Sequence, residues 1–154
     1  MRRPRFQLST GYLNDEDAWQ RRWLGDLFLT EDVARVDEIG RWWFTGRADD
    51  VIVTSGYNVG PVEVESVLLE HSGVVEAAAV AAPDPARGSV VRAVVVRAAD
   101  APAAEVLTDE LQAAVRERVG RHAYPRIVDY VDALPRTETG KLRRAALREP
   151  ASEA

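Results

Sequence analysis

The sequence predicts an α+β fold, in which helices pack on a small three-stranded sheet next to a short β-hairpin. Two observations support this prediction. Hydrophobic residues make up 46% and charged residues 29% of the 154 residues, which are values typical of a globular domain. Beyond residue 50 the apolar patterns follow the order strand, helix, strand, strand, helix, strand, which builds a sheet covered by helices.

The first 24 residues lack a clear periodicity, and the run 14–17 is a turn or helix-start signal. Strand-like runs follow at 33–37 and 41–45, and the three residues between them can form a hairpin turn. Two strands are only marginally stable alone, and these two carry several aromatic side chains. The hairpin therefore indicates a missing partner.

The polar link 46–50 separates a tryptophan-bearing segment from one that is rich in valine and alanine. We place a domain boundary at Asp49 for this reason. A short apolar strand at 51–53 and a glycine-bearing loop at 54–60 are expected to follow.

Three helices and three strands are expected in the rest of the chain. The first helix begins at Pro61, which the first turn of a helix tolerates, and is closed by Gly73. The second is capped by Thr108 and ended by Gly120, and the third is short and covers 142–148. The strands are expected at 74–82, 89–98 and 127–131.

Lys141 is the only lysine in a chain with nineteen arginines. Arginine presents a planar fork, whereas lysine presents a compact point charge on a flexible stem. Gly140 widens the backbone angles available to the polar loop 135–141, so that its neighbour can come close to a ligand. The pattern favours a mobile loop that brings one cation to a phosphate or carboxylate, with a solvated surface lysine as the alternative.

Composition argues against several classes of function. The net charge of −5 makes nucleic acid an improbable partner. No apolar run reaches the length of a membrane span, and the first twenty residues contain no apolar run typical of a signal peptide. The absence of cysteine excludes disulfides and a thiol nucleophile and fits a reducing compartment. We therefore expect a soluble, cytoplasmic protein with no membrane partner.

Two familiar kinds of site are also absent from the pattern. The loop before Lys141 is not a phosphate-binding P-loop, because Pro135 and Leu142 stand where glycine and serine or threonine are required. His71 and His122 lie far apart, without metal-ligand spacing, so no metal site is expected.

Six motifs occur in the order found in adenylate-forming enzymes. They are Thr-Glu-Asp at 30–32, Gly-Arg-Ala-Asp-Asp at 46–50, the run from Val to Glu at 53–65, Pro-Asp-Pro-Ala-Arg-Gly at 83–88, Tyr-Pro-Arg at 124–126 and Leu-Pro-Arg-Thr-Glu-Thr-Gly-Lys at 134–141. From about Gly11 to Arg148 the chain resembles the C-terminal part of an acyl-CoA synthetase, related to acetyl-, medium-chain and benzoate-type CoA ligases.

This resemblance implies an acid–thiol ligase. Such an enzyme activates a carboxylic acid with ATP and Mg²⁺ to an acyl-adenylate and transfers the acyl group to coenzyme A. Residues 1–48 would be the tail end of its N-terminal adenylation domain, with the remnant β-hairpin, and residues 49–154 the C-terminal lid domain. The missing adenylation domain, in the same gene or a separate chain, would hold the small carboxylic acid. The isolated chain is expected to be inactive and to bind no cofactor alone.

The resemblance also implies site residues. Lys141 would bridge the carboxylate and the α-phosphate during adenylation. Asp32 would bind the ribose hydroxyls of ATP, Arg47 would contact the ribose or a phosphate, and Asp49 would be the hinge on which the lid rotates. Glu31 stands where the family often has glycine, which makes ribose binding at Asp32 less secure.

The loop that lines the coenzyme A tunnel would contain Ser55, Gly56, Tyr57 and Asn58. Asn58 stands where many CoA ligases carry arginine or lysine, which weakens a phosphate contact but not the fold. Glu63 would orient this loop or act as a favourable first-turn acid.

Two other interpretations remain open. The chain could belong to an adenylation domain that serves the pantetheine thiol of a carrier protein. It could also be a binding or regulatory module that kept the fold, lost catalysis and forms a homodimer through Trp23, Trp42 and Trp43.

Overall fold

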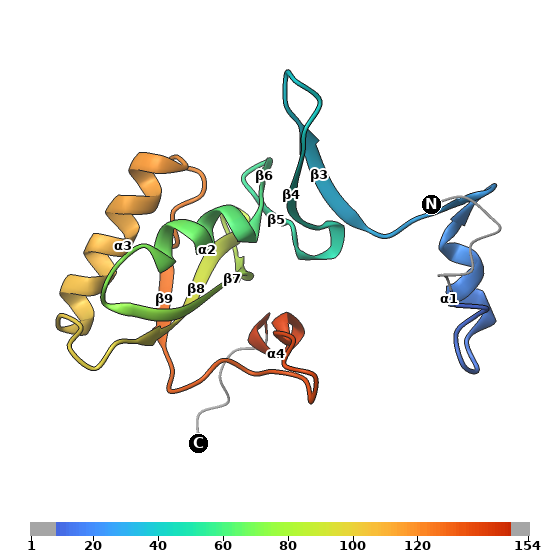
Figure 1. Cartoon of the computed structure of the whole chain (residues 1–154). Coiled ribbons are helices and arrows are strands. Elements are labelled where there is room, and N and C mark those ends of the chain that lie inside the picture. Colours follow the sequence, from blue (N-terminus) through green and yellow to red (C-terminus); the bar gives the residue numbers. More distant parts are fainter. Residues whose placement is uncertain (1–8, 149–154) are drawn as a thin grey trace.

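A computed structural model describes residues 9–148 of the chain (Figure 1). Its largest body is a three-stranded sheet with helices packed against it, which confirms the α+β prediction. The three strands are confirmed as well. They are β7 (Val74–Asp84), β8 (Gly88–Arg97) and β9 (Ile127–Tyr130), which lie in the spatial order β7-β8-β9.

Strands β7 and β8 form a long antiparallel ribbon, whereas β9 pairs with β8 in parallel. A parallel pair needs a crossover connection, and helix α3 (Ala104–Arg118) provides it. Buried valine and alanine side chains alternate between the two faces of β7 and β8. Such a sheet must be covered on both sides to be stable.

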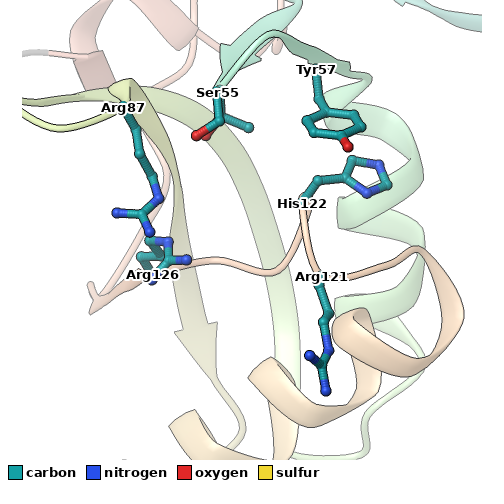
Figure 2. A pocket seen from close by; sticks show the side chains of 7 residues that line it. Ser55, Tyr57, Arg87, Arg121, His122 and Arg126 are labelled. Atoms are coloured by element: carbon teal, nitrogen blue, oxygen red, sulfur yellow. The ribbon is translucent and has the colours of Figure 1, made fainter.

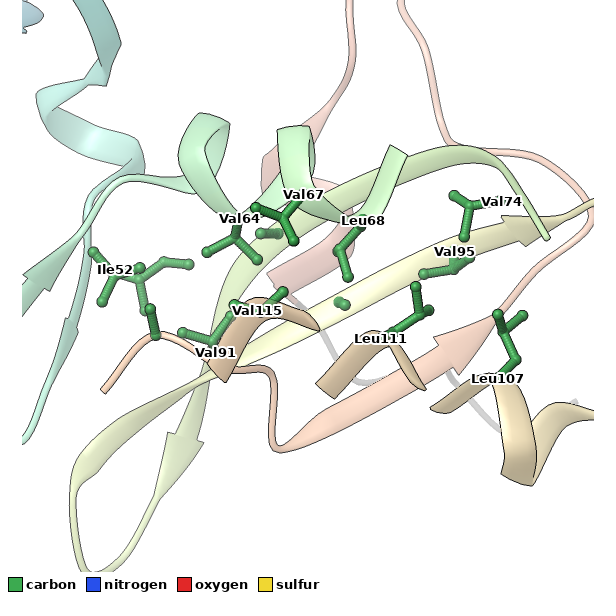
Figure 3. Close-up of a cluster of buried hydrophobic side chains, with 14 residues drawn as sticks. Ile52, Val64, Val67, Leu68, Val74, Val91, Val95, Leu107, Leu111 and Val115 are labelled. Carbon is green, nitrogen blue, oxygen red and sulfur yellow. The ribbon is translucent and has the colours of Figure 1, made fainter. Parts of the chain in front are cut away.

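One face of the sheet is covered by α2 (Pro61–Leu69) and α3, whose apolar sides meet over the strands (Figure 3). Leu68, Leu107 and Leu111 are fully buried in this layer. Burial of one leucine side chain contributes roughly 1.5–3 kcal/mol, so this core holds both helices in place. Ile52 is buried in the same core and anchors the segment that leads into α2.

The other face carries a smaller core beneath the short helix α4 (Arg144–Arg148). Leu134 and Leu147 pack there against Ala78 and Val80 of β7. Arg92 of β8 donates from Nη1 to the carbonyl oxygen of Leu147 at 3.0 Å. The chain segment between Leu134 and Leu147 is thus held to the sheet at both ends.

The start of α3 differs from the prediction. The helix begins at Ala104, and its N-cap residue Ala103 makes no side-chain capping hydrogen bond. Thr108 therefore lies inside the helix, where its Oγ1 is 2.9 Å from the hydroxyl oxygen of Tyr130. Burial of Leu107 on the sheet extends the helix toward its N-terminus and overrides the capping preference of threonine.

The ends of two other helices also differ. Helix α2 ends at Leu69, so Gly73 does not close it. A Cβ on Gly73 would lie 3.2 Å from Leu107, and the glycine permits this close approach to α3. Helix α4 begins at Arg144 rather than at 142, because Leu142 still pairs with the preceding loop.

The segment 54–60, expected as a loop, forms part of a β-hairpin. Strand β5 (Ile52–Thr54) pairs with β6 (Tyr57–Val59). The two turn residues have positive φ angles, 48° at Ser55 and 82° at Gly56, as a tight two-residue hairpin turn requires. The strand was missed because it has only three residues, two of them exposed.

The N-terminal part begins with α1 (Glu16–Arg21), whose N-cap Asp15 accepts a hydrogen bond from the Ala18 amide at 3.0 Å. This confirms the helix-start signal at 14–17. A small hairpin follows, made of β1 (Trp23–Leu24) and β2 (Leu27–Phe28), which the sequence pattern did not predict. It is held by an aromatic cluster with centroid distances of 5.1–5.6 Å, formed by Tyr12, Trp19, Trp23 and Phe28.

The expected hairpin at 33–45 is confirmed as β3 (Asp32–Val36) paired with β4 (Trp42–Arg47). It projects away from the sheet and links it to the N-terminal part (Figure 1). Trp42 is 76% exposed and Phe44 58% exposed. Trp23 packs in the aromatic cluster with Trp19 and Phe28, and a homodimer through the three tryptophans stays a prediction.

The turn of this hairpin is organised by the carboxylate of Asp37. It accepts hydrogen bonds from Trp43 Nε1 at 2.9 Å, Arg41 Nε at 2.7 Å and the Arg41 amide at 2.8 Å. These bonds, with that from Trp43 the most important, lower the pKa of Asp37 to about 2.

Within residues 9–148, no helix is long and apolar enough to cross a membrane.

Removal of the Trp43 hydrogen bond should raise the pKa of Asp37. In the Trp43→Phe variant, the midpoint of an NMR titration of the Asp37 carboxyl carbon should move from about 2 toward the ordinary value of 3.8. Because the pKa of Asp37 is lower in the folded chain than in the unfolded chain, the ionised carboxylate stabilises the hairpin fully at pH values above 3.8. This contribution is lost as the pH falls through about 2. Trp42→Phe is the control, and an equal shift in both variants would contradict this assignment.

Truncation of the core of α3 should destabilise the domain. Leu111→Ala removes a fully buried side chain and should lower the free energy of unfolding by about 2–5 kcal/mol. Val106→Ala, on the exposed side of the same helix, should change it far less. Urea denaturation of both variants measures the difference, and equal losses would be incompatible with the packing described.

Candidate functional site

The loop that carries Lys141 is a closed turn. The Thr137 amide donates to the carbonyl oxygen of Lys141 at 2.8 Å, and the Gly140 amide donates to the carbonyl oxygen of Thr137 at 2.9 Å. The Lys141 amide donates to Thr137 Oγ1 at 3.0 Å. Gly140 has a φ angle of 81°, a region that glycine adopts without steric cost. The polar residues of this loop thus fix its backbone.

Lys141 is exposed and lies at the C-terminal end of this turn, opposite Thr137 and next to the bridge residue Leu142. Its ammonium makes no hydrogen bond or ion pair with any residue from 9 to 148, whereas many of the arginines are paired with carboxylates. Its backbone is therefore fixed while its charge is free to reach a ligand. The loop itself is a closed turn rather than the mobile loop expected from the sequence, and delivery of the charge to a ligand stays a prediction.

Asp32, Arg47 and Asp49 lie together at the base of the β3–β4 hairpin. Arg47 Nε is 3.0 Å from Asp49 Oδ1, and Arg47 Nη1 is 3.8 Å from Asp32 Oδ1. Arg47 also pairs through Nη2 with Glu31 Oε2 at 2.9 Å. Three carboxylates thus share one guanidinium in this partly exposed cluster.

Glu31 has an unusual backbone conformation. Its φ angle is 64°, in the left-handed region that favours glycine. Its side chain pairs with both Arg22 and Arg47. The pairing with Glu31 also contributes most to the raised pKa of Arg22. The two ion pairs help to hold the residue in a conformation that is otherwise unfavourable.

Asp49 lies in a single 3₁₀ turn (Ala48–Asp50) between β4 and β5. Arg148 of α4 donates from Nη2 to the Asp49 carbonyl oxygen at 2.7 Å and to Asp50 Oδ1 at 2.6 Å. Arg144 Nη2 pairs with Glu65 at 2.7 Å. The boundary expected at Asp49 is thus a short connection whose C-terminal side is tied to the sheet domain.

The turn of the β5–β6 hairpin borders a pocket of about 300 Å³ (Figure 2). Ser55 and Tyr57, both expected at a binding loop, lie in its wall. The pocket is strongly basic, since three of its seven lining residues are arginines and none is a carboxylate. The lining residues are Thr54, Ser55, Tyr57, Arg87, Arg121, His122 and Arg126.

Five of these seven lining residues, all except Ser55 and Tyr57, were not predicted as site residues from the sequence. Arg87 comes from the β7–β8 turn, and Arg126 precedes β9, so they are distant in sequence and meet only in the fold (Figure 2). His122 stacks on Tyr57 with ring centroids 4.8 Å apart. The Pro-Asp-Pro-Ala-Arg-Gly and Tyr-Pro-Arg motifs contain both of these arginines and could have identified them.

The expected site residues form separate groups. Asn58 faces a second pocket, of about 470 Å³, between the β3–β4 hairpin and α2, and Glu63 lines it too. Gly56 occupies the hairpin turn beside the basic pocket, and Lys141 does not line that pocket. Within residues 9–148, no group of three or more histidine and acidic side chains could hold a metal ion.

Comparison with known proteins gives a consistent result. A model of the family described as "AMP-binding enzyme C-terminal domain" matches residues 63–141. The chain is 49% identical over 135 residues to the mitochondrial acyl-coenzyme A synthetase ACSM4 of Mus musculus, covering 86% of this chain and 23% of that protein. The chain thus spans about a quarter of the length of the curated relatives it matches.

Solved structures agree with the sequence comparison. The benzoate CoA ligase of Burkholderia xenovorans LB400 superposes with a TM-score of 0.79 at 38% identity, covering 91% of this chain and 28% of that one. The amide bond synthetase McbA of Marinactinospora thermotolerans gives a TM-score of 0.80 at 37% identity, covering 90% of this chain and 28% of that one.

The region that the family model matches ends at Lys141 and includes Arg87 and Arg126 of the basic pocket. The chain therefore belongs to the family of C-terminal domains of AMP-binding, adenylate-forming enzymes.

Proposed function

We propose that this chain is the C-terminal lid of an AMP-forming acyl-CoA synthetase. The observation that carries the proposal is Lys141, a lone lysine whose ammonium has no partner among the described residues and whose backbone closes a hydrogen-bonded turn. Membership of the family and similarity to acyl-coenzyme A synthetases support it. The chain would contribute to catalysis only together with an adenylation domain.

In this proposal Lys141 acts in the first half-reaction. The oxygen of a carboxylate attacks the α-phosphorus of ATP, and the bond to pyrophosphate breaks. Negative charge accumulates between the two reacting groups, and an ammonium placed there lowers the barrier. A flexible lysine stem on a fixed turn can reach such a position without reorganising the loop.

The cluster at the base of the β3–β4 hairpin would bind the nucleotide. Asp32 would accept hydrogen bonds from the ribose hydroxyls, and Arg47 would contact the ribose or a phosphate. Arg47 already pairs with three carboxylates, so it must exchange some of these partners to contact a phosphate. The described residues do not fit a metal ion, and Mg²⁺ would enter with ATP on the adenylation domain.

Asp49 would be the hinge between residues 1–48 and 49–154. The 3₁₀ turn around it is short and exposed, and Arg148 holds the peptide that follows it. Rotation would then be confined to the backbone angles of Asp49 itself, while the sheet domain moves as one body. The lid could present Lys141 in one pose and the β5–β6 turn in the other.

The acceptor in the second half-reaction would be coenzyme A. The basic pocket provides guanidinium groups for its phosphates, while Ser55, Gly56, Tyr57 and Asn58 would line the path of the pantetheine. Arg87 and Arg126 could provide the positive charge for a phosphate contact that is missing at Asn58, where many CoA ligases carry arginine or lysine. The pocket favours an acceptor with several phosphates over the single phosphodiester of a carrier protein.

The partner would be the missing adenylation domain, which would also hold the small carboxylic acid. The exposed aromatic side chains Trp42 and Phe44 offer an apolar surface for it. The same surface could serve a homodimer, although Trp23 packs elsewhere. A cytoplasmic location stays a prediction.

Loss of the Lys141 charge should separate the two half-reactions. In the complete ligase, Lys141→Ala should slow adenylation by about 10²–10³-fold, because one group that stabilises developing charge is removed. Thioester formation from supplied acyl-adenylate should stay within about twofold. Pyrophosphate release and thioester appearance measure the two steps. Arg143→Ala, a nearby exposed cation, is the control, and equal losses in both steps would refute the assigned role.

The basic pocket should distinguish acceptors by their phosphates. Arg87→Ala should raise the KM for coenzyme A about tenfold, since it removes a charged hydrogen bond, and should leave the KM for pantetheine unchanged. Arg118→Ala, on the outer surface of α3, should affect neither. If Arg87→Ala changes both KM values equally, the pocket does not bind the acceptor's phosphates.

A further inference from the structure

A β-bulge near the start of β7 turns one acidic side chain toward the Lys141 loop. Val74 pairs with Arg97 and Glu76 with Val96, so Val75 is an extra residue in the ladder. A bulge of this kind reverses the alternation of side chains between the two faces of a sheet. The reversal shows in which of the two cores the side chains of β7 are buried before and after the bulge.

Val74 is buried in the core beneath α2 and α3. In a regular strand Glu76 would lie on the same face, since side chains two residues apart point the same way. Beyond the bulge, however, Ala78 and Val80 lie in the other core, beneath α4. The bulge thus places Glu76 on the α4 face, which is the face followed by the segment from Leu134 to Leu147.

Arg136 connects Glu76 to the backbone of the Lys141 loop. Its Nη2 donates to Glu76 Oε2 at 2.6 Å, and its Nη1 donates to the carbonyl oxygen of Gly140 at 3.0 Å. That carbonyl belongs to the peptide bond joining Gly140 to Lys141. One guanidinium therefore fixes the peptide that determines where the lysine stem starts, and it does so from outside the turn.

The Arg136–Glu76 pair is not positioned to add much stability. The two side chains are 46% and 37% exposed. Exposed ion pairs typically contribute little to folding, because water screens both charges. Because the arginine also binds a loop carbonyl, its geometry is better suited to holding the turn at one place over the sheet than to stabilising the domain.

We propose that Arg136, held by Glu76, is a positioning residue for Lys141. The proposal rests on the adenylation role given to Lys141 above. The guanidinium holds the Gly140–Lys141 peptide, so that the ammonium starts from a defined point when the lid closes on the carboxylate and the α-phosphate. The guanidinium binds the carbonyl and the carboxylate through two separate nitrogens in a rigid planar fork, a geometry that the single nitrogen of lysine does not reproduce.

Amide exchange and half-reaction kinetics test the proposal together. In the 154-residue chain, Arg136→Gln should increase the amide hydrogen-exchange rates of Gly140 and Lys141 severalfold and leave the melting temperature nearly unchanged. In the complete ligase the same variant should lower kcat for adenylation about tenfold, because a displaced catalytic group loses its alignment. The KM for ATP and the transfer from supplied acyl-adenylate should not change.

Matched variants separate positioning from charge. Arg118→Gln removes a comparable surface pair, with Glu70 just after α2 as its partner, and should alter neither exchange in the loop nor adenylation. Exchanging the partners, as Arg136→Glu with Glu76→Arg, restores an ion pair but offers no donor to the Gly140 carbonyl. This double variant should remain slow in adenylation, and recovery of the normal rate would overturn the proposal.

Different results would refute the positioning role of Arg136 and the adenylation role of Lys141. Unchanged exchange at Gly140 and Lys141 in Arg136→Gln would show that the arginine does not hold the loop. If Arg136→Gln slows both half-reactions equally and lowers the melting temperature, Arg136 stabilises the fold and does not position Lys141. If Lys141→Ala retains full adenylation, the proposed function itself is wrong, and the positioning role is overturned with it.

Discussion

Burial of both faces of one small sheet is the constraint on which the rest of this structure depends. Valine and alanine side chains of β7 and β8 point to both sides, so each side needs a covering layer. Helices α2 and α3 provide one layer, and α4 with its preceding segment provides the other. The β5–β6 hairpin leads into α2, and the Lys141 turn leads into α4. Two candidate binding segments are therefore anchored to opposite sides of one rigid body.

Arginine provides most of the polar connections around this body. Arg92 holds the end of α4, Arg144 ties that helix to Glu65 of α2, and Arg148 binds the connection at Asp49. Each guanidinium makes several directed hydrogen bonds, which suits it to fixing one segment against another. Lysine is poorly suited to such a role, and the one lysine has no such contact within residues 9–148. The contrast between fixed arginines and an unpaired lysine matches a rigid lid that presents a mobile charge.

Much of this could be predicted from the sequence because the signals were local. The alternation and length of the valine runs indicate β7 and β8, and the uniqueness of Lys141 marks its loop as a candidate binding segment. The motifs at 83–88 and 124–126 contain Arg87 and Arg126, but local patterns do not show that the two arginines share one pocket, because they meet only through the pairing of strands. The start of α3 was misplaced for a related reason, since burial of Leu107 outweighs the capping preference of Thr108. The bulge before Glu76 depends on the register of β7 with β8, which local patterns do not give.

The most direct test of the central claim is complementation of a separately produced adenylation domain. ATP–pyrophosphate exchange, measured with the carboxylic acid present, reports the first half-reaction alone. The domain without a lid should exchange slowly, addition of this chain should restore exchange, and addition of the Lys141→Ala chain should not. If the folded chain binds the domain but restores no exchange, or if the alanine variant restores it fully, the claim that this lid delivers the catalytic ammonium is contradicted.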